Sequence, residues 1–223
     1  MKYALVADIH ANLTALRLVL DDLQAQGCTH VACLGDLVGY NGQPKECVDL
    51  IRQMAIPCVK GNYDEYCCAD LRLDGFNSRT LEHIQWTRDQ LTEEDRAWLR
   101  GLPYVASVSG FQIVHASLNQ PERWAYVFDR VSARFQFDHQ TAPICFFGHT
   151  HVPVAYVNDS AVRGGSYSKF SLEPDRKYFV NVGSVGHPRD GEGKATYAIY
   201  DLDVRSVELR RLDLPPALKG SAA

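Results

Sequence analysis

Five short segments of the sequence end in side chains that can bind metal ions. They are Ala7-Asp8-Ile9-His10, Gly35-Asp36, Gly61-Asn62-Tyr63-Asp64, Val114-His115-Ala116-Ser117 and Gly148-His149-Thr150-His151. Each follows an apolar run of strand length. A single D-x-H triplet or a lone histidine at a strand end is more often structural, whereas both imidazoles of an H-x-H turn can converge on one point. Five such segments in succession predict a metal centre.

The residue types indicate which ions this centre would take. Carboxylate, amide and imidazole ligands together suit manganese, iron or zinc better than magnesium or calcium, which prefer oxygen alone. Two divalent ions about 3.5–4 Å apart repel each other and need an anionic bridge, which Asp36 can supply. We therefore predict two divalent ions, with manganese favoured and iron, zinc or nickel as alternatives. The predicted ligands are Asp8, His10, Asp36, Asn62, His115, His149 and His151.

The first sixty residues have the pattern needed to bring these ligands together. Apolar runs over residues 2–7, 30–34 and 57–60 predict strands, and helical spacing over residues 12–26 and 44–54 predicts the helices between them. This βαβαβ order is typical of parallel strands with helical crossovers. Ligands bind at the carboxyl edge of such sheets, so Asp8, Asp36 and Asn62 are expected on one rim.

The rest of the chain predicts a second, strand-rich half. Two helices are expected within Ser78–Arg100, broken near Thr92, followed by strands over residues 104–108, 111–114, 144–147, 152–157, 178–182, 195–200 and 204–209. We predict an α/β fold, a four-layer αββα sandwich of two mixed β-sheets flanked by helices. Residues 1–213 would form a single domain, with a helical cap insertion around residues 76–101 and a flexible tail over residues 214–223.

The motifs resemble those of the calcineurin-like metallophosphoesterase family, whose pattern is D-x-H, G-D, G-N-H-D, a later H, and G-H-x-H. The match runs from Asp8 to His151. The resemblance implies a β-sandwich flanked by helices and a phosphoesterase that uses a metal-bridging hydroxide for in-line attack on phosphorus. It also implies that Asp36 bridges two ions. One ion would take Asp8, His10, Asp36 and His151, and the other Asp36, Asn62, His115 and His149.

One residue departs from that pattern. Tyr63 stands where the family has a histidine that steadies the phosphate or protonates the leaving group. A phenol, with an ordinary pKa near 10, is a poor acid at neutral pH. Some small bacterial and archaeal members that resemble phosphodiesterases also lack this histidine, so we predict a phosphodiesterase acting on a small diester or nucleotide. The expected catalytic residues are Asp36, Asn62, Tyr63 and Asp64.

The sequence leaves several alternatives open for the roles of these residues and for the activity. Tyr63 could point away from the site, with His187 or a metal-bound water acting instead, and Asp64 could merely orient a ligand. The chain could be a phosphomonoesterase, a protein phosphatase or a dinucleoside-polyphosphate hydrolase. It could also be a non-catalytic metal-binding scaffold, since a retromer subunit resembles this fold.

Four further residues are candidates for binding substrate. Asn12 could place the substrate or cap a helix, and Tyr40 could line the pocket or form a turn. His187 and Arg189 lie in a glycine-rich loop, and Arg189 could pair with a phosphate. Residues 124–128 could join the cap, with Trp124 and Tyr126 stacking on a base or filling the core.

Composition narrows the class of partner. The 223 residues carry a net charge of −4, and the 23 basic residues form no run, so no extended nucleic-acid surface is expected. No stretch approaches the roughly 18–20 apolar residues of a membrane span, and no signal peptide is recognisable. Seven cysteines without paired spacing predict reduced thiols and a cytoplasmic protein. The expected partner is a small phosphorylated substrate; the sequence sets no oligomeric state.

Overall fold

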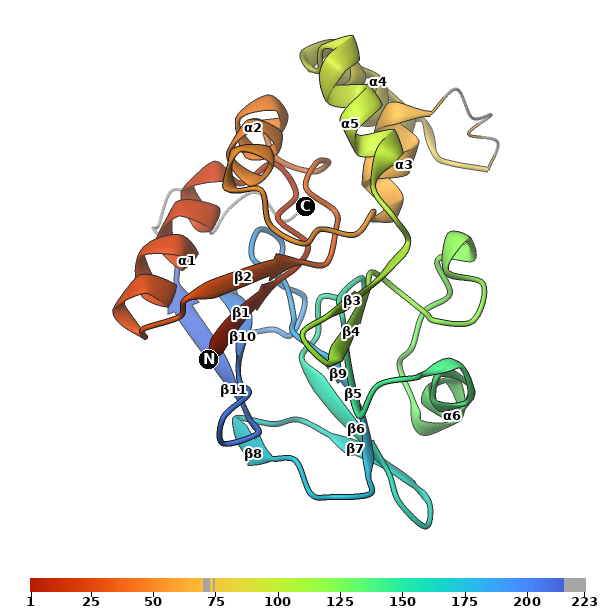
Figure 1. Cartoon of the computed structure of the whole chain (residues 1–223). Coiled ribbons are helices and arrows are strands. Elements are labelled where there is room, and N and C mark those ends of the chain that lie inside the picture. Colours follow the sequence, from red (N-terminus) through yellow and green to blue (C-terminus); the bar gives the residue numbers. More distant parts are fainter. Residues whose placement is uncertain (70–72, 74, 215–223) are drawn as a thin grey trace.

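The structure is a computed structural model, and it describes residues 1–69, 73 and 75–214 (Figure 1). The helices are α1 (Leu13–Ala25), α2 (Pro44–Met54), α3 (Asn62–Cys68), α4 (Ser78–Gln90), α5 (Glu93–Gly101), α6 (Arg130–His139) and the 3₁₀ turn η1 (Pro121–Arg123). The strands are β1 (Lys2–Val6), β2 (His30–Cys33), β3 (Val105–Val108), β4 (Phe111–Val114), β5 (Ile144–Phe147), β6 (Val154–Asn158), β7 (Val162–Gly165), β8 (Lys169–Ser171), β9 (Lys177–Asn181), β10 (Lys194–Asp201) and β11 (Ser206–Asp213).

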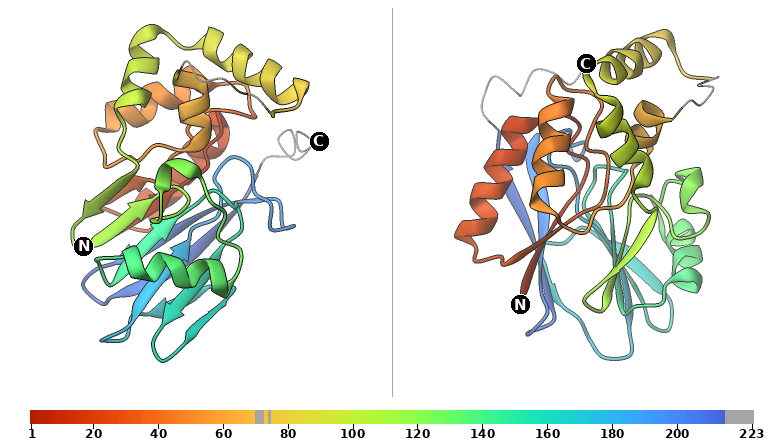
Figure 2. Two further views of the ribbon diagram at one scale, coloured as in Figure 1. Left: turned by 90° about the vertical axis from the view of Figure 1, so that its right-hand side faces the viewer. Right: turned by 45° about the horizontal axis from the view of Figure 1, so that its top comes forward.

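The strands form two mixed sheets that pack face to face. One has the order β2-β1-β10-β11-β8 and the other β3-β4-β5-β9-β6-β7. Strand β1 is parallel to β2 and antiparallel to β10, while β5 lies between two parallel neighbours, β4 and β9. Helices α1 and α2 cover the outer face of the first sheet and α6 that of the second (Figures 1 and 2). This arrangement confirms the predicted αββα sandwich.

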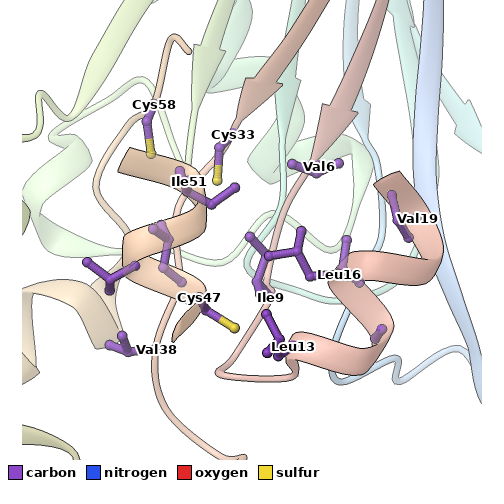
Figure 3. Close-up of a cluster of buried hydrophobic side chains, with 14 of the residues drawn as sticks. Val6, Ile9, Leu13, Leu16, Val19, Cys33, Val38, Cys47, Ile51 and Cys58 are labelled. Carbon is purple, nitrogen blue, oxygen red and sulfur yellow. The ribbon is translucent and has the colours of Figure 1, made fainter. Parts of the chain in front are cut away.

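Strand β1 shows how the layers are joined. Successive side chains of a strand point to opposite faces. Ala4 and Val6 therefore pack with the helical layer, while Leu5 and Ala7 pack between the two sheets. Figure 3 shows Val6 in the first of these clusters, among side chains of α1 and α2. Because both faces are buried from Tyr3 onward, β1 is apolar from Ala4 to Val6 and leads directly to Ala7 and Asp8.

Helix α6 provides the fourth layer. Its buried residues Ala133 and Phe137 pack on Phe147 and Phe179 of the second sheet. Its other face leaves Val131 and Phe135 exposed to solvent. The sequence predicted neither α6 nor the short elements α3, β7 and β8, because exposed apolar residues and glycines obscure their periodicity.

The predicted third strand, residues 57–60, is wrong. It is reduced to one bridge between Cys33 and Cys58. Lys60 turns away and donates its backbone N–H to Pro103 just before β3. Asn62 consequently begins α3 instead of ending a strand.

The predicted helical pair is confirmed, with its break at Thr92. The Thr92 hydroxyl caps α5 by accepting the Asp95 N–H, and the Asp95 carboxylate accepts the Thr92 N–H in return. Helices α4 and α5 pack against α2 and α3; that this pair caps the site stays a prediction. Leu214, expected in the tail, is buried in the core, and residues 215–223 lie outside the described residues.

Two remaining expectations concern cysteines and membranes. All seven cysteines carry free thiols, and six of them are buried. In the described part of the chain, no helix has the length and apolar character needed to cross a bilayer.

Candidate metal centre

The predicted ligands sit on loops with an unusual backbone. Asp8, His10, Asp36, His149 and His151 all have positive φ angles, between 48° and 66°. A residue other than glycine pays about 1 kcal/mol or more for this conformation, which is concentrated at functional sites. The left-handed turns direct the side chains toward one another across the ends of β1, β2 and β5.

These side chains converge on a small buried volume. The Oδ1 atom of Asp8 lies 3.3 Å from His151 Nε2 and 3.8 Å from His10 Nε2. The Oδ2 atom of Asp36 lies 3.5 Å from both His10 Nε2 and His115 Nε2. Two sets of three residues could each hold an ion, one formed by Asp8, His10 and His151 and the other by Asp8, Asp36 and His115.

The last two predicted ligands, Asn62 and His149, lie on the side of His115. The His115 Nε2 atom is 3.1 Å from Asn62 Oδ1. The imidazole of His149 lies 5.1 Å from that of His115, centroid to centroid, and its Nε2 contacts the Trp124 carbonyl at 3.0 Å. Its Nδ1 is therefore the atom left for a ligand. The fold thus brings together all seven predicted ligands.

Backbone carbonyls orient three of the imidazoles. The Nδ1 atoms of His10, His115 and His151 lie 3.0, 2.8 and 2.5 Å from carbonyl oxygens. The acceptors belong to Val38, Leu34 and His187. Because Nδ1 carries the proton, Nε2 presents its lone pair to the centre, as in most protein metal sites.

The carboxylates are only partly satisfied by the protein. Asp8 Oδ2 accepts the His149 N–H at 3.0 Å, but its buried Oδ1 has no hydrogen-bond partner. Asp36 Oδ1 accepts the Tyr63 N–H at 2.8 Å. Among the described residues, no lysine or arginine pairs with Asp8 or Asp36. A buried charge is costly unless it is paired or binds a metal, so this donor set fits a divalent cation.

The pKa shifts of the histidines also fit a centre that binds a cation. Burial alone would lower the pKa of His115, but the Asp36 and Asp8 carboxylates raise it to about 9. Burial, together with the neighbouring His115, lowers the pKa of His149 to about 3. Burial and His151 also lower the pKa of His10. The carboxylates attract positive charge into a centre in which the lowered pKa values of His10 and His149 favour the neutral, metal-binding form of these two imidazoles.

Asp64, predicted as catalytic, is engaged with the backbone. Its two carboxylate oxygens accept N–H groups from Asp36, Leu37, Val38 and Gly61, at 2.8 to 3.3 Å. It therefore fixes the Asp36 loop to the start of α3. This geometry makes Asp64 a positioning residue.

Two glycines allow the ligand loops to approach closely. A Cβ atom at Gly61 would lie 2.1 Å from Asp36 Oδ1, and one at Gly148 would lie 2.5 Å from Asp8 Oδ2. Both are closer than a real side chain tolerates. Glycine is required here because each carboxylate rests directly on the neighbouring backbone.

An aromatic wall stands beside His10. The Tyr40 ring stacks parallel on His187, with centroids 4.4 Å apart, and Tyr63 lies 4.7 Å from Tyr40 and 5.4 Å from His10. Arg189 Nη2 donates to the Tyr40 hydroxyl at 2.9 Å. Tyr63 thus faces the site, and the predicted substrate residues Tyr40, His187 and Arg189 gather with it.

Asn12 has a structural task instead. Its Oδ1 caps α1 by accepting the Ala15 N–H at 3.0 Å, and its Nδ2 donates to the Gly186 carbonyl at 3.2 Å. These bonds favour the helix-cap alternative. The amide fastens the glycine-rich loop to the first ligand loop.

Two residues that position the ligand loops were not predicted from the sequence. The Ser184 hydroxyl donates to the Asp8 carbonyl at 2.8 Å, and the Asn181 amide donates to the Gly148 carbonyl at 2.5 Å. Both lie in or beside the glycine-rich loop that the sequence singles out. Their partners are distant in sequence, so only the fold identifies their role.

A buried Asp/His centre at the ends of strands in a two-sheet sandwich is the arrangement of a metal-dependent hydrolase. Residues 1–205 match the family model of the calcineurin-like phosphoesterase superfamily domain. The chain belongs to this family, and it is a metal-dependent phosphoric ester hydrolase.

Individual proteins are similar to the chain over nearly its whole length. The chain is 37% identical to the uncharacterized protein MJ0912 of Methanocaldococcus jannaschii over 216 residues, covering 94% of this chain and 86% of the relative. A metallophosphoesterase from Sphaerobacter thermophilus has 34% identity and a TM-score of 0.84, covering 98% of this chain and 96% of that one. A hypothetical protein of Pyrococcus horikoshii, PH1004, shares the fold at 19% identity and a TM-score of 0.76, covering 98% and 90%.

Proposed function

We propose that the chain is a dinuclear phosphodiesterase acting on a small phosphodiester. The observation that carries the dinuclear part is the position of Asp36 Oδ2, at 3.5 Å from both His10 Nε2 and His115 Nε2. An oxygen equidistant from two imidazoles is suited to bridge two ions, and an anionic bridge offsets their mutual repulsion.

The remaining ligands divide between the two sides of this bridge. We assign Asp8, His10 and His151 to one ion, and Asn62, His115 and His149 to the other. Asp8 Oδ1 is nearer to His151 Nε2, at 3.3 Å, than to His115 Nε2, at 4.0 Å. The mixed donors favour manganese, with iron, zinc or nickel as alternatives. When bound, such ions supply Lewis-acid neutralisation of charge on the phosphoryl oxygens. Hydrogen bonds to backbone groups of the chain hold and orient the side chains that would bind these ions.

Tyr63 supports the choice of a diester. Its ring faces the site beside His10, and Gly39, where a Cβ would lie 2.5 Å from Tyr63 Cδ1, supports it from behind. A phenol there can donate a hydrogen bond but is a poor acid at neutral pH. Without a positioned acid, hydrolysis is favoured for esters with a good leaving group, since general acid catalysis typically contributes about 10²–10⁴-fold.

The proposal includes a small phosphorylated substrate and a cytoplasmic location. The seven free thiols support this location, because thiols stay reduced in a reducing compartment. A phosphomonoesterase, a protein phosphatase and a dinucleoside-polyphosphate hydrolase are the alternatives within the same chemistry.

Rates on two chromogenic esters test the reaction. With manganese, bis-p-nitrophenyl phosphate should be hydrolysed faster than p-nitrophenyl phosphate, and metal titration by calorimetry should give two ions per chain. Asp36→Asn should lower both the rate and the stoichiometry. A strong preference for the monoester would overturn the diester assignment, and one ion per chain would overturn the dinuclear one.

Substitution of Tyr63 tests the leaving-group argument. Tyr63→His should raise the rate on alkyl and phenyl esters relative to nitrophenyl esters, because an imidazole can protonate a basic leaving group. Tyr63→Phe is the matched control and should leave that relative rate as it is. If Tyr63→Phe selectively slows the alkyl esters, the phenol already acts as the acid and the argument fails.

A further inference from the structure

The chain between η1 and α6 contacts one side of the candidate metal centre through Trp124. The Trp124 carbonyl contacts His149 Nε2 at 3.0 Å, and its indole Nε1 donates to Glu65 Oε2 on α3 at 3.2 Å. Trp124 also has a positive φ of 55°. This segment is therefore held rigidly at its start.

Beyond Trp124 the segment places two aromatic rings in solvent. Val127 is buried in the cluster beneath α6. Its neighbours Tyr126 and Phe128 point outward, and they are 50% and 66% exposed. Exposing two large rings is unfavourable, so a ligand that covers them would recover that free energy.

The two rings continue a stack that begins at the metal centre. Tyr126 stacks on His149, a predicted metal ligand, with centroids 4.1 Å apart and planes at 30°. Phe128 stacks on Tyr126 at 5.0 Å, with planes at 7°. The rings Tyr126 and Phe128, which we call the aromatic platform, thus extend outward in steps from the site of phosphate chemistry.

A cation lies in the wall beside His10. Arg189 Nη2 donates to the Tyr40 hydroxyl at 2.9 Å, and its guanidinium carbon lies 5.6 Å from the centroid of the Tyr40 ring. No carboxylate of the described residues forms an ion pair with Arg189. A free guanidinium beside a phosphate site is suited to bind phosphate oxygens.

We propose that the aromatic platform binds the nucleobase of a nucleotide diester whose phosphate lies at the metal centre. This inference rests on the proposed phosphodiesterase function and narrows its substrate class. A base presents a flat π face to a ring, and stacking of this kind changes affinity by about 5- to 150-fold per base. The stack tolerates different bases, so we expect preference for a nucleoside over an alkyl group with little choice among bases.

A second copy of the chain is the competing occupant. Val131 and Phe135 are 69% and 56% exposed, and as residues i and i+4 they share one face of α6, which begins two residues after Phe128. The base is favoured because the platform is continuous with His149, whereas Val131 and Phe135 are not in the stack.

Two diesters with the same leaving group test the proposal. Thymidine 5′-(p-nitrophenyl phosphate) and methyl p-nitrophenyl phosphate differ only in the group that is not released. With manganese, the KM of the thymidine ester should be about tenfold lower. Phe128→Ala should bring the two KM values together, while the control Phe135→Ala should keep them apart. Equal KM values in the unaltered protein would overturn the proposal.

A binding measurement separates failure of this proposal from failure of the proposed function. Thymidine 5′-monophosphate should bind more tightly than ribose 5-phosphate in calorimetry, and Phe128→Ala should remove the difference. If neither ester is hydrolysed but this difference is found, the phosphodiesterase function fails and the platform stands. If Phe128→Ala instead converts a dimer to a monomer in sedimentation and leaves the KM ratio unchanged, the surface joins two chains and the proposal is wrong.

Discussion

Acidic side chains are treated in opposite ways at two places in the molecule. On α1, Asp22 accepts hydrogen bonds from Arg210 Nε and Nη2 at 3.1 and 3.0 Å and from the Tyr197 hydroxyl at 2.7 Å. At the strand ends, Asp8 is fully buried with an oxygen that has no partner, and the Oδ2 atom of Asp36 faces two imidazoles. The first arrangement stabilises the fold. The second leaves buried negative charge that a metal ion can neutralise.

Removing the charge of Asp8 should have the largest effect, and only on function. Asp8→Asn keeps an oxygen for the His149 N–H but removes the unpaired charge. Manganese-dependent hydrolysis should fall at least about 10³-fold, because metal stabilisation of several kcal/mol is lost.

Stability should behave differently in the same variant. Without metal, Asp8→Asn should unfold at the same urea concentration as the unaltered protein or at a higher one. With manganese at 100 times Kd, only the unaltered protein should gain about 2.7 kcal/mol. A large loss of stability in EDTA would show that the protein already neutralises Asp8, and the contrast with Asp22 would disappear.

Asp64 lies between the two cases, since it is buried yet satisfied by four backbone N–H groups. Asp64→Ala leaves these donors without their acceptor, so we expect a loss of about 3 kcal/mol or more in the free energy of unfolding. Urea denaturation measures it, with Glu82→Ala, on the exposed face of α4, as control. A loss no larger than that of the control would mean that the Asp36 loop holds its shape without Asp64.

Close approach of Gly61 to Asp36 predicts a smaller effect. In Gly61→Ala the added Cβ conflicts with Asp36 Oδ1, and we expect a loss of about 1–3 kcal/mol, together with weaker manganese binding. Gly42→Ala is the matched control, since its Cβ would meet nothing within 4 Å. Equal stability and equal manganese affinity of the two variants would argue against close packing at this loop.

The smallest effect is expected at Asp22. Burial alone would raise its pKa, but the bonds from Arg210 and Tyr197 lower it below the ordinary value. A lowered pKa stabilises the fold above the unfolded-state pKa, and that contribution is lost as the pH falls through the folded-state pKa. Asp22→Asn should therefore cost about 1 kcal/mol at pH 7 and progressively less below pH 4.

Urea denaturation at pH 7 and pH 3 measures this difference, and Asp21→Asn, on the exposed side of α1, should change stability at neither pH. A cost for Asp22→Asn that is constant with pH would show that its charge contributes nothing, which removes the contrast with Asp8.

The candidate ligands could be recognised in the sequence because each follows an apolar run, a pattern that local chemistry makes visible. Helix α2 has the predicted bounds, since Pro44 starts it and its apolar spacing is regular. Helix α3 was not predictable. It has seven residues, and its start is fixed by Asp64, whose partners include the Asp36 loop 27 and 28 residues earlier.

The sequence also could not assign the role of the aromatic residues beside the metal centre. The sequence left Trp124 and Tyr126 between core and substrate roles, and composition offers no way to choose. In the structure Trp124 is tied to Glu65 and His149, while Tyr126 remains half exposed. Partners from different parts of the chain decide between such alternatives.

The order of residues alone predicted the sandwich of two sheets and identified seven candidate donor side chains, because strand periodicity and ligand chemistry are local properties. The tertiary structure decided which oxygens stay unpaired, that Asp64 holds a loop while Asp36 faces the centre, and that Tyr63 turns toward His10. These depend on distances of a few ångströms between segments far apart in the chain, which only packing sets.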